Sequence, residues 1–572
     1  MIAYRQFDHF IFRVINSLLF TKVFKIIVLL SLPLLCLGNS DDQKSYYVKP
    51  IDFVCDYPFN DTTKWAVTCR VWGLLKYFHP NVTAGHFDWD KVLIDRIAKI
   101  NEAKSAEQVN EELMQMIRIA GAYEMSIDTA WNDSLNMNVS LCWLDQSFIN
   151  DSIRRMLREI ASLTTVNHWY YVKYKESADK LPIYNEKDYE NNVIDQYEYR
   201  LLALFRYWNV IYYFFPYKYM MDQSWDVTLL KFIPLFLIAN DVSTYQNTVG
   251  QLATRLNDGH GFTSVTPYYD QFKYRYITKI DSLTVVRNPP ESSALERGDI
   301  ILSINKKNIN SYRDSISVLI PSSNMRFTDN AVNGIIYWTI MGGCSLTILR
   351  NQKEISFSEY TKRSSVITPL SPYRSISSEI GYVNLDSLKS FDIPSIIDSM
   401  NLKKGVILDL RNYPIHFKFR DLSCHLIQTK EYCYALSTVA DWSHIGAFYK
   451  EECVTRCPDS LWQDRKQVTC KIAVLINEAT QSWAETLSMD FRTNGYTLVG
   501  APTAGANGNA TIFSLPGNIK VSYSGLGFYF PDGTQMQRTG IIPDIEVYPT
   551  MDDILAGRDE VLEAAITYLN SN

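Results

Sequence analysis

Two stretches of the sequence that start 136 residues apart align without a gap. Residues 69–93 read "CRVWGLLKYFHPNVTAGHFDWDKVL", and residues 205–229 read "FRYWNVIYYFFPYKYMMDQSWDVTL". In both, apolar and aromatic residues recur at helical spacing, a proline ends the first helix, and a Trp-Asp pair opens a second. The duplication therefore predicts two copies of a helix-turn-helix unit, and such repetition is typical of packing rather than of chemistry.

Eight positions match in register between the two copies. They are Arg70 and Arg206, Trp72 and Trp208, Tyr77 and Tyr213, Phe78 and Phe214, Pro80 and Pro216, Trp89 and Trp225, Asp90 and Asp226, and Leu93 and Leu229. We interpret the aromatic positions as core. His79 and His86 have no histidine counterpart in the second copy, and we predict that both lie at the surface.

The length and charge of the chain bound its class. With 572 residues, 47% of them hydrophobic and 21% charged, the chain is long enough for three or four globular domains. Lys and Arg are spread along the chain, and the formal net charge is −6. This balance gives no reason to expect nucleic acid as a partner.

The N-terminal region contains an apolar run followed directly by polar residues. The run "KIIVLLSLPLLCLG", residues 25–38, is short for a membrane-spanning helix and follows Lys22. We therefore predict a signal peptide over 1–38 and export to the periplasm or cell envelope. Retention of the segment, or a lipid on Cys36, are alternatives that would associate the protein with a membrane.

Four cysteines, Cys424, Cys433, Cys453 and Cys457, fall in one stretch of the chain. The spacing of Cys453 and Cys457 allows a zinc site, but no second close Cys or His pair accompanies it. A local disulfide or buried thiols fit better in an exported protein. We predict neither a metal nor a cofactor.

An isolated histidine follows the second helical copy, in "LNDGHGFTSV". Helical spacing stops at Asn257-Asp258-Gly259, which indicates a helix end and a turn. His260 could be an exposed turn residue. Its flanking glycines, however, let the backbone approach another segment closely, and the apolar "FTSV" run predicts a rigid strand as its mount. We place the first helical unit at 39–165 and the second at 166–268.

Residues 269–362 change to the periodicity of short strands. The segment "ALERGDIILSINKKNINSYRD", 294–314, predicts a turn at Arg297-Gly298 and a strand over 299–305. It resembles the Gly-Asp segment of PDZ domains, and "CSLTILRNQKEISFS", 344–358, would supply the closing strands. That resemblance implies a module that captures extended peptides by adding a strand to its sheet edge.

Strands and helices alternate in residues 363–572, which predicts a parallel or mixed sheet covered by helices. Buried-strand runs are found at 405–411, 471–476 and 497–500. A helix follows the second run, and Ser482 and Glu485 stand at its start. Ser-x-x-Glu can be a capping box, and a serine at a strand-to-helix turn can also be a nucleophile. The local sequence leaves both interpretations open.

The order of a PDZ-like module, "LDLRN", "LINEATQSWAETL", "LVGAPTAGANG", "GIIPDIEV" and "GRDEVLEAAITYL" resembles the S41 peptidase family over roughly 270–569. That family comprises the C-terminal processing (tail-specific) proteases and the tricorn-type proteases. The helical front end is similar to that of exported Bacteroidetes members. The resemblance implies a multidomain α/β protein whose C-terminal core, 363–572, has a crotonase- or ClpP-like fold.

The resemblance also implies roles for single residues. Ser482 falls on the family nucleophile and Glu485 on the acid three residues later. The processing branch has a lysine where this chain has Asn507, whereas the tricorn-type branch has a base in a turn that matches His260. The tricorn-type pattern has a glutamate where this chain has Gln537, which can orient a partner but cannot stabilise an imidazolium by charge.

For the oxyanion hole, the family pairs the N–H after the nucleophile, here that of Trp483, with one from a Gly-Gly strand end. In "DLRNYPIHF" the Gly-Gly positions are Ile415 and His416. Ile415 keeps its N–H, but the backbone freedom of glycine is lost.

The leading hypothesis is therefore an exported serine endopeptidase that cleaves unfolded or C-terminally exposed polypeptides with Ser482 and His260, without a cofactor. A second hypothesis is a degenerate peptidase that only binds peptides through its PDZ-like module. Esterase activity on a non-peptide acyl group would use the same residues. The oligomeric state is not predicted.

Overall fold

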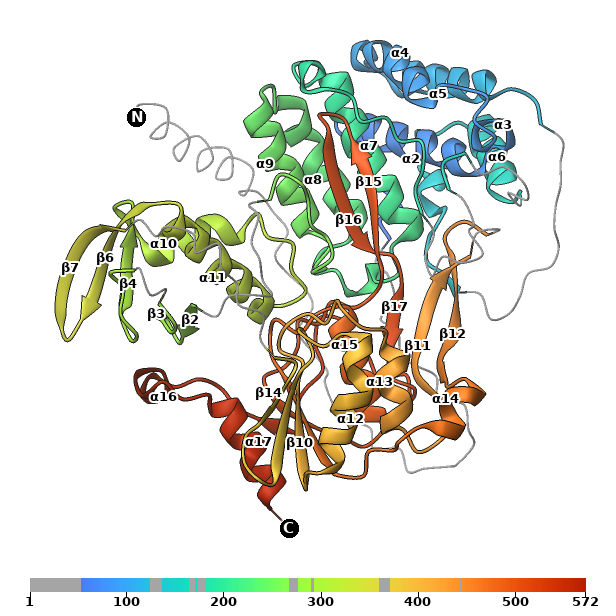
Figure 1. The fold of residues 1–572 in the computed structure, drawn as a ribbon. Coiled ribbons are helices and arrows are strands. Elements are labelled where there is room, and N and C mark those ends of the chain that lie inside the picture. The colour runs from blue at the N-terminus through green and yellow to red at the C-terminus, as the bar shows by residue number, and fades with distance from the viewer. Residues whose placement is uncertain are drawn as a thin grey trace, which may run out of the picture. The chain divides into compact units, whose positions relative to one another are not determined.

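The computed structural model describes residues 53–123, 136–163, 170–172, 182–266, 276–289, 293–359, 371–441 and 444–571. Figure 1 shows their arrangement, with helices in the first half of the chain and mixed strands and helices in the second. The predicted signal peptide and Cys36 lie outside the described residues.

The helical region contains nine elements of four or more residues besides short connecting turns. They are α2 (Thr63–Phe78), α3 (Pro80–Thr83), α4 (Trp89–Glu102), α5 (Ala106–Ala120), η1 (Cys142–Asp145), α6 (Asp151–Ala161), α7 (Tyr197–Phe214), α8 (Trp225–Ile238) and α9 (Val242–Thr254) among the described residues; the strand β1 (Asn136–Met137) and the turns η2 (Asn191–Val193) and η3 (Lys218–Met220) join them. The first helix of each copy ends two residues before its proline, because proline disfavours helical backbone in the residue before it.

Each copy of the duplicated segment contains a reciprocal pair of tryptophans. The indole N–H of Trp72 donates to the Trp89 carbonyl at 3.0 Å, and the indole N–H of Trp89 donates to the Trp72 carbonyl at 3.0 Å. Trp208 and Trp225 make the same two bonds, at 2.9 and 3.0 Å. All four rings are buried. The matched aromatic positions therefore tie the two helices of each copy together.

The two copies are joined by crossed ion pairs at matched positions. Arg70 of the first copy lies 2.8 Å from Asp226 of the second, and Arg206 of the second lies 2.6 Å from Asp90 of the first. All four side chains are at most 6% exposed. Each arginine therefore has a carboxylate partner in the other copy, Arg206 pairs in addition with Glu186 at 2.7 Å, and α2 packs directly against α7.

The prediction that His79 lies at the surface is wrong. His79 is fully buried, its Nε2 lies 3.2 Å from the Gly121 carbonyl, and its ring packs edge-on against Tyr123. Burial lowers the pKa of His79 to about 4. The apolar helical stripe thus continues through this position with a neutral imidazole, whereas His86 is exposed as expected.

The region predicted as PDZ-like forms an antiparallel sheet with two helices. Its strands are β2 (Ile277–Ile280), β3 (Leu283–Val286), β4 (Ile300–Ile304), β5 (Lys307–Asn308), β6 (Cys344–Arg350) and β7 (Lys353–Glu359), and its helices are α10 (Ile309–Ser317) and α11 (Met325–Met341). The strand order is β2-β3-β4-β6-β7, with β5 beside β4. Gly298, with φ +89°, makes the turn into β4 that the Arg297-Gly298 pair predicts.

The C-terminal region is built on a mixed sheet of order β18-β14-β13-β10-β9-β8, in which only the β8–β9 pair is antiparallel. Its strands are β8 (Tyr373–Ser375), β9 (Ile380–Asn384), β10 (Gly405–Asp409), β13 (Lys471–Ile476), β14 (Thr497–Gly500) and β18 (Ile545–Glu546). Its helices are α12 (Ile393–Asn401), α13 (Phe419–Leu426), α14 (Asp459–Asp464), α15 (Trp483–Thr493), α16 (Met551–Ala556) and α17 (Glu560–Asn570). One face of the sheet packs on α12 and α15 and the other on α17, so the strands read as continuous apolar runs.

Two hairpins of the C-terminal region were not predicted. In the first, β11 (Glu431–Ala440) and β12 (Ala447–Arg456) pair with each other, and β1 and β17 (Gly527–Tyr529) join their outer edges. The second, β15 (Ala510–Leu515) and β16 (Ile519–Ser524), lies along α7 (Figure 1). Phe513 and Tyr523 belong to the helical core, and the Tyr245 hydroxyl donates to the Pro516 carbonyl at 2.7 Å. This hairpin therefore connects the C-terminal region to the helices.

Within the described part of the chain there are two disulfides, Cys55–Cys142 and Cys424–Cys457. The second joins two of the four clustered cysteines, so Cys457 is bonded rather than available for the zinc site that its spacing with Cys453 allows. Among the described residues, no group of three or more metal-ligating side chains comes together.

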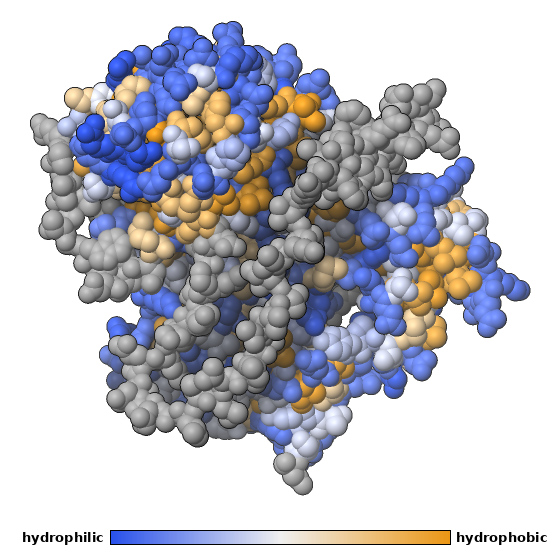
Figure 2. All heavy atoms as spheres, turned by 180° about the vertical axis from the view of Figure 1, so that it is seen from behind, coloured by the Kyte–Doolittle hydropathy of each residue, from blue (hydrophilic) through white to orange (hydrophobic). Residues whose placement is uncertain are grey.

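The surface shown in Figure 2 is hydrophilic over much of its area, with several separate apolar areas. Within the described part of the chain, none of the helices combines the length and the apolar character that a membrane crossing needs.

Replacing Asp226 by alanine leaves the buried Arg70 guanidinium without its carboxylate. We expect the free energy of unfolding to fall by about 3–5 kcal/mol, the cost of breaking a buried ion pair, in urea unfolding followed by tryptophan fluorescence. Asp61→Ala, which removes a carboxylate that is 92% exposed beside Lys64, is the control and should cost at most about 1 kcal/mol. Equal losses in the two variants would contradict the role of the crossed pairs.

Candidate active site

Ser482 stands at a tightly constrained turn between β13 and α15. The Asn477 N–H donates to Thr480 Oγ1 at 3.0 Å, and Thr480 Oγ1 donates to the Leu410 carbonyl at 3.1 Å, so the turn is fixed to the end of the neighbouring strand β10. Ser482 itself has φ +57° and ψ −117°. A non-glycine residue is strained in this region, and such strain is concentrated at functional sites. The serine is half-buried, at the carboxyl end of a parallel strand.

Glu485 is fully buried beneath this turn, where four donors surround its carboxylate. Oε1 accepts from Thr503 Oγ1 at 2.5 Å and from the Gly505 N–H at 2.7 Å. Oε2 accepts from the N–H groups of Ala506 at 3.0 Å and Ser482 at 3.1 Å. Glu485 therefore fixes the 503–506 loop to the start of α15, which is more than the capping expected from sequence.

Burial raises the pKa of Glu485 to about 7, against the four hydrogen bonds, each of which lowers it. Its carboxylate is engaged by donors of the protein itself.

His260 is mounted on β16, the second strand of the hairpin that lies along the helices. The segment after His260 makes an antiparallel bridge between Thr263 and Val521, and the Ser264 N–H donates to the Lys520 carbonyl at 2.8 Å. His260 Nδ1 lies 2.9 Å from Ser524 Oγ, and the side chain is 7% exposed. The "FTSV" run thus gives the predicted rigid mount, through a bridge rather than a full strand.

The turns that carry Ser482 and His260 are in direct contact. Gln481 Nε2 donates to the Gly259 carbonyl at 3.2 Å. A Cβ on Gly259 would come within 2.7 Å of the Ala506 Cβ, so only glycine fits at this approach. The residues directly before Ser482 and His260 are therefore bonded to each other, although they are 222 positions apart in the sequence.

Gln537 and Asn507 are both buried, and Gln537 contacts the turn that carries His260. Gln537 Nε2 donates to Asp258 Oδ1 at 3.2 Å, and Gln537 Oε1 accepts from the Asn507 N–H at 3.2 Å. The Asn507 side chain bonds Thr486 Oγ1 at 3.0 Å. The lysine position of the processing branch is thus filled by a neutral hydrogen-bonding amide, and Gln537 touches the turn of His260 through Asp258.

The two expected oxyanion donors differ in their settings. Trp483 is the first residue of α15, where backbone N–H groups and the helix dipole face the end of the helix. Ile415 lies on the loop after β10, with its side chain 61% exposed. The roles of both N–H groups remain predictions.

Sequence reasoning did not identify the contacts of the 322–327 segment, which leads into α11. Ser323 Oγ accepts from the Gly259 N–H at 2.8 Å, and Asn324 Nδ2 donates to the Ala504 carbonyl at 2.8 Å. Phe327 packs on Ala504 and Ala506. The start of α11 therefore contacts both turns of the candidate site.

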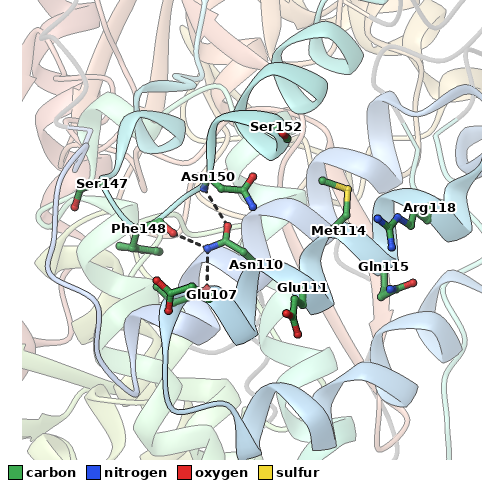
Figure 3. Close-up of a pocket in the computed structure, with 11 residues that line it drawn as sticks. Glu107, Asn110, Glu111, Met114, Gln115, Arg118, Ser147, Phe148, Asn150 and Ser152 are labelled. Carbon is green, nitrogen blue, oxygen red and sulfur yellow. Dashed lines mark hydrogen bonds between the residues drawn. The ribbon is translucent and has the colours of Figure 1, made fainter.

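A separate hollow of about 520 Å³ lies beside α5 (Figure 3). Asn110 at its centre donates to the Phe148 carbonyl at 2.6 Å and accepts from the Asn150 N–H at 3.1 Å. All of its lining residues fall between 106 and 152, so it does not include the turns of Ser482 or His260.

Residues 429–547 match the model of Peptidase family S41. The matched range includes Ser482, Glu485 and Gln537, whereas His260 lies before it. No curated protein matches the chain.

The fold is similar to those of several solved proteases. Mature CPAF in complex with lactacystin is 13% identical, with a TM-score of 0.50, and the match covers 65% of this chain and 98% of that one. A photosystem II D1 C-terminal processing protease is 15% identical, with a TM-score of 0.36, over 65% and 98% of the two chains. A protein from Parabacteroides merdae that is proposed to be a peptidase is 14% identical, with a TM-score of 0.40, over 66% and 97%. At 13% identity the likeness to CPAF concerns the fold alone.

A serine that opens a helix after a parallel strand, within a domain that matches a peptidase model, defines a serine-type peptidase. This class rests on the similarity of residues 429–547 to peptidase family S41.

Backbone strain at Ser482 can be measured with two variants of this residue. Both Ser482→Ala and Ser482→Gly lack the hydroxyl, but only glycine adopts φ +57° without steric cost. We expect the glycine variant to be more stable than the alanine variant by roughly 1 kcal/mol in urea unfolding. A glycine variant that is the less stable of the two would show that the turn is unstrained.

The raised pKa of Glu485 predicts a pH-dependent stability. Between the ordinary pKa of 4.5 and about 7, the folded chain holds a proton that the unfolded chain has released, so this group destabilises the fold as the pH rises through that window. We expect the stability of the wild type relative to Glu485→Gln to fall by up to roughly 3 kcal/mol between pH 4.5 and 7.5. Thermal unfolding midpoints over this range, with Glu478→Gln in the same turn as the control, measure the effect. Parallel pH profiles for the wild type and Glu485→Gln would contradict the assignment.

Proposed function

We propose that this protein is an exported serine endopeptidase that cleaves unfolded or C-terminally exposed polypeptides, with Ser482 as nucleophile and His260 as general base. The observation that carries the proposal is the hydrogen bond between Gln481 and Gly259, the neighbours of these two residues. It supports a site in which the serine hydroxyl and the imidazole act together.

In the proposed reaction, Ser482 Oγ forms a bond to the peptide carbonyl carbon while its proton passes to His260 Nε2. The carbonyl oxygen becomes an oxyanion, which the Trp483 N–H and the start of α15 stabilise. The C–N bond then breaks, the proton on His260 passes to the leaving nitrogen, and an acyl-Ser482 ester remains. Water attacks this ester with His260 again as base, and the carboxylic acid leaves with Ser482 restored.

Residues 276–359 would serve as a PDZ-like module that presents chain ends or unstructured segments to the site. The contacts of Ser323 with Gly259 and of Asn324 with Ala504 support this proposal, because they connect the start of α11 to both catalytic turns. An extended polypeptide is the substrate that such a module and an acyl-transfer site can share.

Export to the periplasm or cell envelope is part of the proposal. The disulfides Cys55–Cys142 and Cys424–Cys457 support it, because disulfides persist in oxidising compartments and are rare in reducing ones. Association with a membrane would depend on the N-terminal apolar run.

A second candidate function is peptide binding without cleavage. It is favoured by Ile415, which replaces a glycine of the family pattern and whose side chain is 61% exposed. A missing oxyanion donor lowers the rate by roughly 10²–10³-fold in other serine hydrolases.

Fluorophosphonate labelling and cleavage of fluorescent casein test the proposal. We expect the wild type to be labelled and to cleave casein, Ser482→Ala to do neither, and His260→Ala to be slower by a factor of at least about 10³ in both assays. Ser488→Ala is the matched control: Ser488 is buried on the same helix and donates to the Ala484 carbonyl, so this variant should keep its labelling.

If the wild type binds unfolded casein but is neither labelled nor active, the peptidase proposal is wrong and peptide binding without cleavage is the function. Labelling that survives in Ser482→Ala would place the nucleophile elsewhere.

A further inference from the structure

We propose that Asp258 is a positioning residue that acts through Ser524 to hold the His260 imidazole in the tautomer that a general base requires. The proposal rests on the proposed function and deepens it. It names the carboxylate that replaces the glutamate missing at position 537. Asp258, Ser524 and His260 together are called the relay below.

The direction of each proton in the relay follows from the groups involved. Ser524 Oγ lies 2.8 Å from Asp258 Oδ1 and 2.9 Å from His260 Nδ1. A carboxylate oxygen only accepts, so the single hydroxyl proton of Ser524 points to Asp258. The Ser524 oxygen must then accept from His260, which places the ring proton on Nδ1. In the neutral imidazole, the lone pair is then on Nε2.

Asp258 is built to receive hydrogen bonds. It is fully buried, and four donors point to its carboxylate. They are the Ser524 hydroxyl at 2.8 Å, the Ser524 N–H at 2.6 Å, the His260 N–H at 3.1 Å and Gln537 Nε2 at 3.2 Å. Within the described ranges of the chain, no lysine or arginine forms a salt bridge with it. A buried carboxylate with these donors and without a cation favours positive charge on a nearby imidazole.

Two titratable side chains, Tyr207 and Tyr217, lie close enough to the relay to be affected by the charge of Asp258, and Tyr217 is also affected by that of Glu485. The negative charge of Asp258 contributes to the raised pKa of both tyrosines, after the larger effect of burial. Glu485 is held by its own donors across the 503–506 loop. Asp258 is therefore the carboxylate that shares hydrogen bonds with the His260 ring through a single intervening atom.

Position 537 shows why the relay needs a neutral residue there. Gln537 donates to the same oxygen, Asp258 Oδ1, that accepts from Ser524. A glutamate at 537 would place a second carboxylate 3.2 Å from Asp258, where like charges repel. The neutral amide of Gln537 therefore donates a hydrogen bond to the Asp258 carboxylate where a second carboxylate would repel it.

The first test compares kinetic constants for casein-derived peptide cleavage in four variants. In Asp258→Asn the new amide can donate to Ser524, so the Ser524 proton turns toward His260 and the ring proton moves to Nε2. We expect kcat to fall roughly 10³–10⁴-fold with little change in KM. Ser524→Ala should lower kcat roughly 10- to 100-fold, the effect of one hydrogen bond to a charged group, and Ser524→Thr, which keeps the hydroxyl, should recover most of it.

Ser522→Ala is the matched control. Ser522 lies on the same strand, is buried like Ser524, and donates to the His260 backbone carbonyl at 2.5 Å instead of contacting the ring. If Ser522→Ala and Ser524→Ala lower kcat equally, or if Asp258→Asn keeps the wild-type kcat, the relay is overturned.

The second test does not depend on activity. The Ser482→Ala protein is labelled with ¹⁵N-histidine, and its ring nitrogen signals are recorded by NMR. The His260 signals are those that are lost in a Ser482→Ala/His260→Ala protein. They should report the Nδ1–H tautomer. Adding Asp258→Asn should shift them to the Nε2–H tautomer. An Nε2–H ring in the Ser482→Ala protein would overturn the relay. The expected tautomers in a protein whose wild type cleaves nothing would uphold the relay and refute the proposed peptidase function.

Discussion

The antiparallel contact between the segment after His260 and strand β16 determines how this chain can assemble a site. The hairpin of β15 and β16 leaves the α/β region and enters the helical core, where Phe513 and Tyr523 are buried. Its second strand bridges Thr263 through Val521 and bonds the His260 ring through Ser524. The duplicated helices thus form a scaffold that brings a histidine to a serine on another fold region.

The two buried carboxylates of the site, Glu485 and Asp258, have different hydrogen-bond partners. Glu485 uses both oxygens to hold the 503–506 loop and the Ser482 N–H, so it serves the geometry of the turn. Asp258 is the carboxylate connected to the imidazole ring. A departure from the family pattern at Gln537 is therefore matched by a carboxylate in the His260 turn itself. In the helices, Arg70 and Arg206 likewise pair with a carboxylate of the other copy.

Local features of the sequence predicted much of the fold. The runs 471–476 and 497–500 coincide with β13 and β14, because strands buried on both faces leave a continuous apolar signal. The glycines around His260 indicated the close approach that Gly259 makes to Ala506. Ser524 escaped prediction because its partners, Asp258 and His260, are distant in sequence. The β11–β12 hairpin was also not predicted, although its two strands follow one another in the chain. His79 was misjudged because a buried imidazole and an exposed one look alike without the fold. The partner of Gln537, Asp258, stood in the quoted turn but read only as a turn former.

The structure of the protein after reaction with a fluorophosphonate tests the central claim most directly. The account predicts phosphorus bonded to Ser482 Oγ, with His260 Nε2 within about 3.2 Å of that oxygen, as proton transfer requires, and with Nδ1 still bonded to Ser524. A phosphorus on another residue, or a His260 ring turned away from the modified Ser482, would contradict it.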